Sequence, residues 1–412
     1  MVEPAILLPI AALLAIYALV SRWLMPRAVT APMIFTAAGF GLSAAFGSIL
    51  PMASQDAVLV GFAELTLVIL LFSDAARVKL ADLKRTGRLA ARLLFVALPL
   101  SLLLGTLLAR WVSPDQPWAV ALLVAAILTP TDAALAQAFI SSDAYPERLR
   151  TTIKIESGLN DGLVLPLVLS AAILAAVSAM EGQPDMAADL VHTVPLQLLL
   201  GPVIGVAIGW LGAKALDWCE ARALAAESLS GPYFIAMALG AFWLAELVGG
   251  NGFLAAFLGG LAFGNTTECR RPFVHEFVES EGRLLTIATF IVFGALMVPL
   301  ALAHASWQTL VLAIGFLTVV RIAPALLALL GTDLGWRDRL MLGWFGPRGL
   351  ASILFVLLML ERYEVPGSRE VLACTVLTVL ISVFAHGASA AWLSRLYSGD
   401  AGGSRNSAQT GA

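Results

Sequence analysis

The sequence predicts an all-α polytopic membrane protein of about 13 transmembrane helices, with inverted repeats and two crossing broken helices. Of its 412 residues, 59% are hydrophobic and only 13% are charged, whereas a soluble domain has about 25% charged residues. Apolar stretches near the roughly 20 residues that cross a bilayer follow one another along the chain. Proline and glycine interrupt two of these stretches beside charged side chains, and this predicts the broken helices.

We expect thirteen spans, because thirteen apolar segments are separated by polar or turn-forming residues. These segments are 4–24, 30–50, 57–73, 89–111, 117–140, 151–179, 192–217, 230–248, 252–265, 284–303, 306–331, 343–360 and 369–397. The small and polar residues 398–412 are expected to form a disordered cytoplasmic tail.

Loop charges agree with this count. Loops that follow odd-numbered segments, with their flanks, carry most of the 25 Lys and Arg residues. Because Lys and Arg are enriched in cytoplasmic loops, we expect the N-terminus outside and the C-terminus in the cytoplasm. No basic patch suggests a nucleic-acid partner. The first apolar segment lacks a basic start, so we interpret it as a mature span.

The fifth segment contains the run TPTDAALAQAF at residues 129–139. Pro130 removes a backbone donor and should bend or break the helix. Broken backbone inside a bilayer occurs only where protein or a water-filled cavity satisfies it. Thr129, Thr131 and Asp132 could supply those partners. A simple proline kink is the alternative for Pro130 taken alone.

The sixth segment contains IESGLND, in which Ser157, Asn160 and Asp161 share one helical face. They offer hydroxyl, amide and carboxylate oxygens, which suit a small alkali cation. An ionised carboxylate in a span costs roughly 2.5–3.5 kcal/mol, and burial favours its neutral form. Asp161 could therefore exchange H⁺ for a cation, or serve instead as a structural partner of an arginine. Glu156 points to another side of the helix.

A second interruption is predicted in the run GWFGPRGLAS at residues 343–352, where Arg348 is embedded. An arginine inside a membrane needs a partner, and Glu156 is the first candidate, with Asp132 second. Breaks in the fifth and twelfth segments are typical of inverted repeats with a site between them. Arg348 and Asp132 could neutralise the facing half-helix ends, which would leave Asp161 as the carrier.

Three other charged residues are candidate pathway groups. Glu64 lies in the middle of the third segment and Asp74 at its end, in LLFSDAARV; either could serve the site. Arg321, in the eleventh segment, could pair structurally or line the cytoplasmic funnel. The cysteines and histidines lack the spacing of metal ligands, so we expect no cofactor. A monovalent cation at Asp161 would be cargo.

The motifs TPTDAALA, ESGLNDG and GPRG, with LLFSDA and NGFLAAFLGGLAFGN, resemble the monovalent cation:proton antiporter-1 family. This family contains NhaP-type sodium/proton antiporters and the sodium/proton exchangers of animals. The resemblance covers nearly all thirteen segments. It implies one transporter domain over residues 1–397, with core helices near 89–179 and 306–397 and the rest mainly scaffold. It also implies a homodimer in a bacterial inner membrane and an elevator-like alternating-access movement.

The resemblance also implies roles for individual residues. Asp161 would bind cation and proton in competition, Asn160 would complete the family's Asn-Asp pair, and Ser157 and Thr131 would add oxygen ligands. The Asn-Asp pair is associated with electroneutral exchange.

Glu156 is implied to pair with Arg348. Asp132 is expected among the cation- and proton-binding residues and is implied to steady the crossing of the broken helices. We therefore expect a secondary antiporter, not an enzyme, that exchanges Na⁺, Li⁺ or K⁺ for H⁺ within membrane lipid. A cation channel and a K⁺/H⁺ efflux protein on the same scaffold are alternatives. A hydrolase using Asp132 and Asp161 as a carboxylate dyad would lack a recognisable nucleophile or metal motif.

Overall fold

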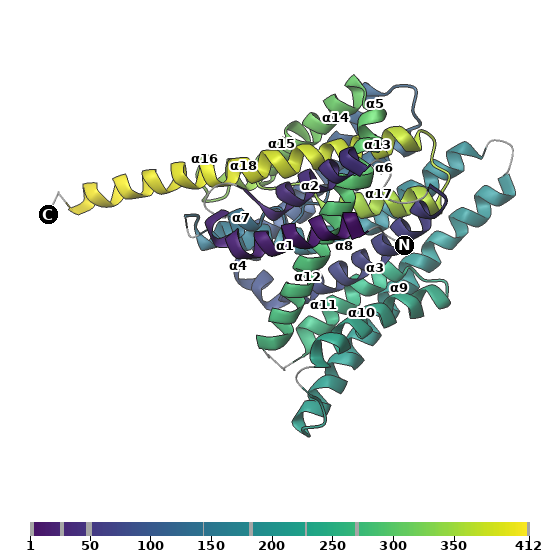
Figure 1. Cartoon of the computed structure of the whole chain (residues 1–412), viewed down its shortest axis with the longest axis horizontal. Helices are drawn as coiled ribbons and strands as arrows, with labels where there is room; N and C mark the ends of the chain where they lie inside the picture. The colour runs from purple at the N-terminus through teal and green to yellow at the C-terminus, as the bar shows by residue number, and fades with distance from the viewer. Residues whose placement is uncertain are drawn as a thin grey trace.

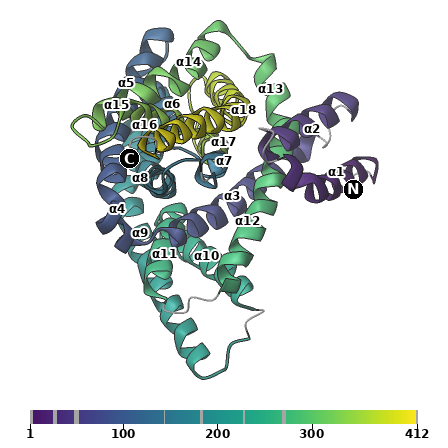
Figure 2. The same ribbon diagram turned by 90° about the vertical axis from the view of Figure 1, so that its left-hand side faces the viewer.

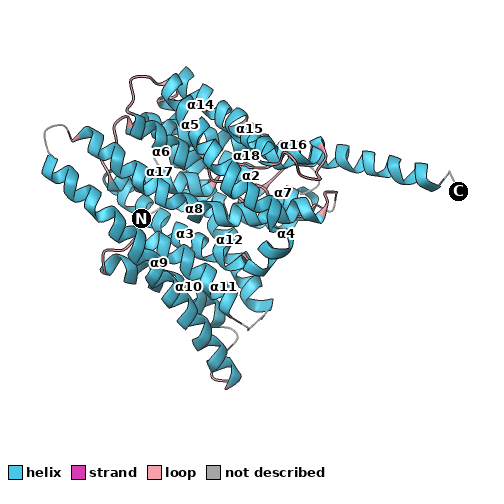
Figure 3. Ribbon diagram, turned by 180° about the vertical axis from the view of Figure 1, so that it is seen from behind, coloured by secondary structure: helices cyan, strands magenta, loops and turns pink. Residues whose placement is uncertain are grey.

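The computed structural model describes residues 4–24, 29–46, 52–142, 144–180, 184–226, 229–267 and 272–409. Regular secondary structure within these ranges is helical, without strands (Figure 3). The predicted fold class is confirmed.

Each of the thirteen predicted segments contains at least one helix, and two short π-helical turns, η2 and η4, interrupt longer helices. The elements are α1 (Pro4–Leu24), α2 (Ala31–Phe46), α3 (Met52–Arg77), α4 (Leu80–Arg92), η2 (Leu93–Ala97), α5 (Leu98–Val112), α6 (Trp118–Leu128), α7 (Gln137–Ile140), α8 (Glu147–Ala179), α9 (Pro184–Ala221), α10 (Ser230–Leu247), α11 (Gly252–Thr266), α12 (Pro272–Val292), η4 (Phe293–Met297), α13 (Val298–Ala303), α14 (Trp307–Leu317), α15 (Val319–Ala328), α16 (Trp336–Trp344), α17 (Leu350–Arg362) and α18 (Ser368–Gln409).

Seven helical stretches in the described part of the chain are long and apolar enough to cross a membrane. Shorter apolar helices, among them α2, α6 and α11, accompany them. Helix α6 is short, with 11 residues, because the chain unwinds at Pro130. The chain is therefore a multi-pass membrane protein in which the broken helices are shorter than a full span.

The helices pack in two groups on either side of α8. Helices α9, α10 and α11 pack on one another, and α10 and α11 also pack on α3, whereas α5, α6, α14, α15 and α18 lie on the other side (Figures 1 and 2). Helix α8 contacts both groups. The predicted division into core and scaffold stays a prediction.

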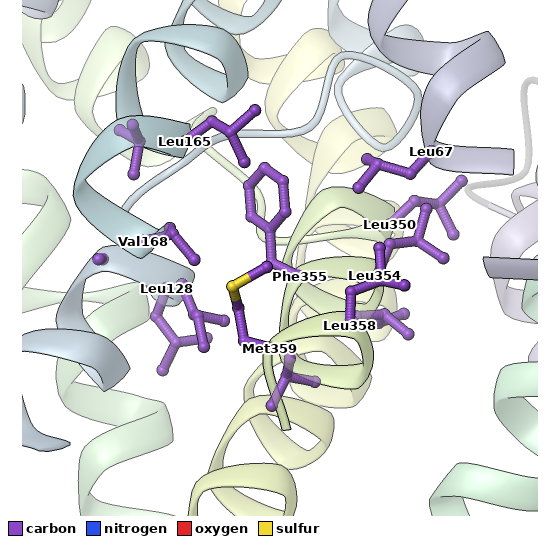
Figure 4. Close-up of a cluster of buried hydrophobic side chains, with 14 of the residues drawn as sticks. Leu67, Leu128, Leu165, Val168, Leu350, Leu354, Phe355, Leu358 and Met359 are labelled. Atoms are coloured by element: carbon purple, nitrogen blue, oxygen red, sulfur yellow. The ribbon is translucent and has the colours of Figure 1, made fainter. Parts of the chain in front are cut away.

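Helix α17 is held by a buried apolar cluster that follows the second break. Phe355 lies among side chains of α3, α6 and α8, including Leu67, Leu128 and Val168 (Figure 4). Such contacts matter because helices in lipid associate mainly through close packing and interhelical hydrogen bonds. This cluster fixes α17 beside α6 and α8, the helices that carry the predicted site.

Helix α18 differs from the prediction at its C-terminal end. It continues to Gln409 and projects from the bundle (Figure 1), where the sequence predicted a disordered tail from residue 398. No proline follows Pro366, so the backbone has no obligatory stop. Gly399, Gly402 and Gly403 each weaken a helix by less than a proline would.

Candidate functional site

The two predicted breaks lie against each other inside the bundle. Helix α6 ends at Leu128 and α16 ends at Trp344, and non-helical backbone follows each of them. The backbone N–H of Asp132 donates a hydrogen bond of 2.9 Å to the carbonyl of Pro347. The interrupted segments of the two halves therefore satisfy each other's backbone, as broken helices in a membrane must.

The Asp132 carboxylate caps the start of α17. Its Oδ2 accepts from the N–H of Leu350, the first residue of α17, at 2.7 Å. Its Oδ1 accepts from the N–H groups of Ala134 at 2.6 Å and Leu135 at 3.2 Å. A side chain at Gly349 would overlap the Asp132 carboxylate. The negative charge thus lies where the helix dipole is positive.

Arg348 makes the complementary contact at the end of α6. Its guanidinium donates to the carbonyls of Thr129 and, at 2.8 Å, Pro130. The Arg348 residue is 0% exposed, so these carbonyls have no competing solvent. Ser352 of α17 adds a hydrogen bond of 2.7 Å to the carbonyl of Ile127. Ser352 is a site residue that was not predicted, and its sequence signal is a hydroxyl just after GPRG.

The predicted ion pair between Glu156 and Arg348 is wrong. Glu156 instead pairs with Arg321 of α15 in a bidentate contact, with N–O distances of 2.5 and 2.9 Å. Arg321 also donates to the carbonyls of Leu342 at 3.1 Å and Gly343 at 3.2 Å, at the end of α16. The prediction sought a carboxylate partner for Arg348, whereas the Arg348 guanidinium contacts backbone carbonyls at the end of α6 and leaves Glu156 to Arg321.

Three predicted ligands, Thr131, Ser157 and Asn160, come together beside the crossing. Asn160 donates to the Thr131 hydroxyl at 2.5 Å, and the Thr131 and Ser157 hydroxyl oxygens are 3.0 Å apart. Asp161 follows Asn160 on α8. The Oδ1 atoms of Asn160 and Asp161 are buried without a hydrogen-bond partner, which is rare for buried polar atoms. Oxygen atoms of these kinds replace the hydration shell of alkali ions in proteins.

The two candidate pathway carboxylates of α3, Asp74 and Glu64, lie in different environments. Asp74 forms an ion pair of 3.7 Å with Arg77 and interacts electrostatically with Asp132 and Asp161. Glu64 is ten residues away, about 15 Å along the helix, and interacts instead with Arg362 and Glu246. The structure therefore brings Asp74, and not Glu64, towards the predicted site.

Among the described residues, no group of three or more His, Cys, Asp or Glu could hold a metal ion.

These features define a membrane transporter of the broken-helix class, in which polar groups meet where discontinuous helices cross. The family described as "Sodium/hydrogen exchanger, transmembrane" matches residues 10–396, and the chain belongs to this family. The resemblance seen in the motifs is thereby confirmed.

Curated relatives include antiporters from a bacterium and a yeast. The chain is 27% identical to the K(+)/H(+) antiporter NhaP2 of Shewanella oneidensis, over 80% of this chain and 56% of the relative. It is 26% identical to Na(+)/H(+) antiporter 2 of Zygosaccharomyces rouxii, over 68% of this chain and 38% of the relative. The chain thus spans about half or less of the length of these relatives.

Solved structures show the same fold. The sodium proton antiporter MjNhaP1 from Methanocaldococcus jannaschii at pH 8 aligns with a TM-score of 0.71 at 19% identity, covering 93% of this chain and 98% of that chain. An electron-microscopy structure of the same antiporter aligns with a TM-score of 0.74 at 18% identity, covering 95% and 97%.

Proposed function

We propose that this chain is a secondary active antiporter that exchanges a monovalent cation for H⁺, with both ions competing for Asp161. The observation that carries the proposal is the buried, unpartnered carboxylate oxygen of Asp161 beside the polar cluster of Thr131, Ser157 and Asn160. The names of the relatives, which are K⁺/H⁺ and Na⁺/H⁺ antiporters, support the same class.

The charges around the crossing favour one exchangeable carboxylate. Glu156 is neutralised by Arg321, while the charges of Asp132 and Arg348 are engaged with backbone at opposite half-helix ends. The Oδ1 atom of Asp161 has no hydrogen-bond partner among the described residues, and Arg348 interacts with this carboxylate only electrostatically. If Asp161 carries either one proton or one cation, each cycle moves no net charge, and exchange is electroneutral.

The same proposal includes the setting of the protein. We place the protein in a bacterial inner membrane as a homodimer surrounded by lipid. The N-terminus is placed outside, since Lys and Arg concentrate in loops after odd-numbered segments. Alternating access would move a core containing α6, α8 and α17 relative to the scaffold. An accessibility assay of single-cysteine variants in loops tests the orientation, and crosslinking in membranes tests the dimer.

The transported ion is a monovalent cation, Na⁺, Li⁺ or K⁺, and flux measurements with each ion distinguish them. The Shewanella relative is named as a K⁺/H⁺ antiporter, which favours K⁺, whereas the yeast relative is named for Na⁺. Selectivity among these ions depends on the number and geometry of oxygen ligands.

The deciding experiment is cation-driven proton flux in proteoliposomes that contain a pH dye, with Na⁺, Li⁺ and K⁺ added in turn. Wild-type flux should persist when the membrane potential is collapsed, and Asp161→Asn should abolish it. Asp115→Asn, at an exposed loop aspartate, is the matched control and should retain flux. Flux retained in Asp161→Asn, or ion conductance that ignores a pH gradient, would contradict the proposal.

A further inference from the structure

A second set of polar side chains supports the break between α16 and α17 from α18. Ser382 and His386 are 0% and 2% exposed, respectively, although they lie in an apolar helix. They face the two ends of the break, Trp344 on one side and Arg348 on the other. Neither belongs to the oxygen cluster around Asp161, and buried polar groups of this kind call for an explanation.

The contacts form a continuous chain across the break. The backbone N–H of Arg348 donates to Ser382 Oγ at 2.8 Å. Ser382 Oγ lies 3.2 Å from His386 Nδ1, and His386 Nε2 lies 3.0 Å from the carbonyl of Trp344. The Trp344 ring stacks on the imidazole at a centroid distance of 4.9 Å, and its indole N–H donates to Ser389 at 2.9 Å.

The direction of these hydrogen bonds follows from the acceptors. The Trp344 carbonyl can only accept, so His386 Nε2 carries a hydrogen. His386 Nδ1 lies 3.2 Å from the Ser382 hydroxyl and 3.0 Å from the Ser382 carbonyl, one turn earlier on the same helix. The two imidazole nitrogens thus join the backbone at the end of α16 to the backbone of α18.

We propose that Ser382 and His386 form a brace that sets the position of the second break and, through it, the geometry of the cation site. The brace fixes the backbone of Arg348, whose guanidinium holds the end of α6. The adjacent carbonyl of Pro347 holds the backbone of Asp132.

Thr131 precedes Asp132, and its hydroxyl contacts Ser157 and Asn160. Displacement at the brace would consequently reach the oxygen cluster beside Asp161. His386 is thus a positioning residue. This step rests on the proposed function, whereas the brace itself does not.

Two measurements on the full-length protein test the proposal. Hydrogen–deuterium exchange of peptides covering residues 343–352 reports whether the break is held. The apparent KM for the cation in proteoliposomes reports whether the site is positioned. The variants are His386→Leu, His386→Gln and Ser382→Ala. The matched control is Thr378→Val, which removes a buried hydroxyl on α18 that bonds only within its helix, to Cys374 at 2.7 Å.

We expect His386→Leu and Ser382→Ala to accelerate deuterium exchange at the break and raise the apparent KM about tenfold, the effect of losing about 1.4 kcal/mol. His386→Gln keeps an N–H that can donate to the Trp344 carbonyl, so its deuterium exchange and apparent KM should be close to those of wild type. Thr378→Val should change neither the deuterium exchange nor the apparent KM. Melting temperatures identify variants that fail to fold. If His386→Leu does not fold, Ser382→Ala tests the brace with a smaller change.

Unchanged deuterium exchange in His386→Leu and Ser382→Ala would overturn the brace. Faster exchange with an unchanged KM would overturn its influence on the site. Equal defects in His386→Gln and His386→Leu would overturn the hydrogen-bonding role and require the imidazole itself. If the wild-type protein shows no cation-driven proton flux, the proposed function fails, and deuterium exchange alone decides the brace.

Discussion

The ion pair between Glu156 and Arg321 makes the sharpest prediction about stability. Its side chains are 3% and 5% exposed, and the closer N–O distance is 2.5 Å. Removing one partner of such a buried pair typically costs about 3–5 kcal/mol, because the other charge is left uncompensated. Glu156→Gln retains one acceptor oxygen, and Arg321 retains its contacts with two carbonyls. We therefore expect a loss near the lower limit, about 3 kcal/mol.

A double-mutant cycle identifies the partner of Glu156. Glu156→Gln, Arg321→Gln and the double variant are compared by melting in detergent and by denaturant unfolding. The double variant should lose less stability than the two single losses combined, with a coupling of about 1–3 kcal/mol, as for residues in one network. The parallel cycle with Arg348→Gln should give a smaller coupling, because Arg348 contacts the end of α6.

Two results would refute this reasoning. One is a Glu156→Gln protein as stable as the wild type, and the other is a stronger coupling of Glu156 with Arg348 than with Arg321. A stable but inactive Glu156→Gln variant would instead assign Glu156 to ion binding.

Three further perturbations follow from packing and loop contacts. Phe355→Ala empties the centre of the cluster around α17 and should cost about 3–5 kcal/mol, measured by denaturant unfolding; a loss below about 1 kcal/mol would contradict the packing. Arg362→Gln breaks a partly exposed 2.8 Å pair with Glu246 and should cost no more than about 1 kcal/mol, so a large fall in melting temperature would contradict this. A hydrogen bond from Arg148 lowers the pKa of Asp333 below its ordinary value of 3.8. The stabilisation that the Asp333 carboxylate contributes is therefore present above pH 3.8 and is lost as the pH falls through the lowered pKa. Asp333→Asn should differ from wild type in melting temperature at pH 7 but not at about pH 2.

Local sequence carried enough information for the breaks and for the side chains that meet there. Pro130 and the GPRG run act on their own backbone, so their effect is readable without a structure. Helical periodicity likewise places Ser157, Asn160 and Asp161 on one face. The meeting of Thr131 with Ser157 and Asn160 is less local, and the paired motifs indicated it through the family resemblance.

Pairing between distant charges could not be derived in the same way. Glu156 is 165 positions from Arg321, and the alternative partner, Arg348, is equally buried in an apolar segment. Which arginine reaches the carboxylate depends on the packing of α15 against α16. Likewise, Ser382 and His386 gain a role only because α18 packs against the break. No spacing within α18 predicts that contact.

The three polar groups at the broken helices follow one electrostatic rule. Arg348 lies at the C-terminal end of α6 and Arg321 at the C-terminal end of α16, where the helix dipole is negative. Asp132 lies at the N-terminal end of α17, where the dipole is positive. Each of these charges is tied to backbone that only a rearranged fold could release. A carboxyl that must gain and lose an ion in every cycle cannot be tied in this way, and Asp161, with its unpartnered oxygen, meets that requirement.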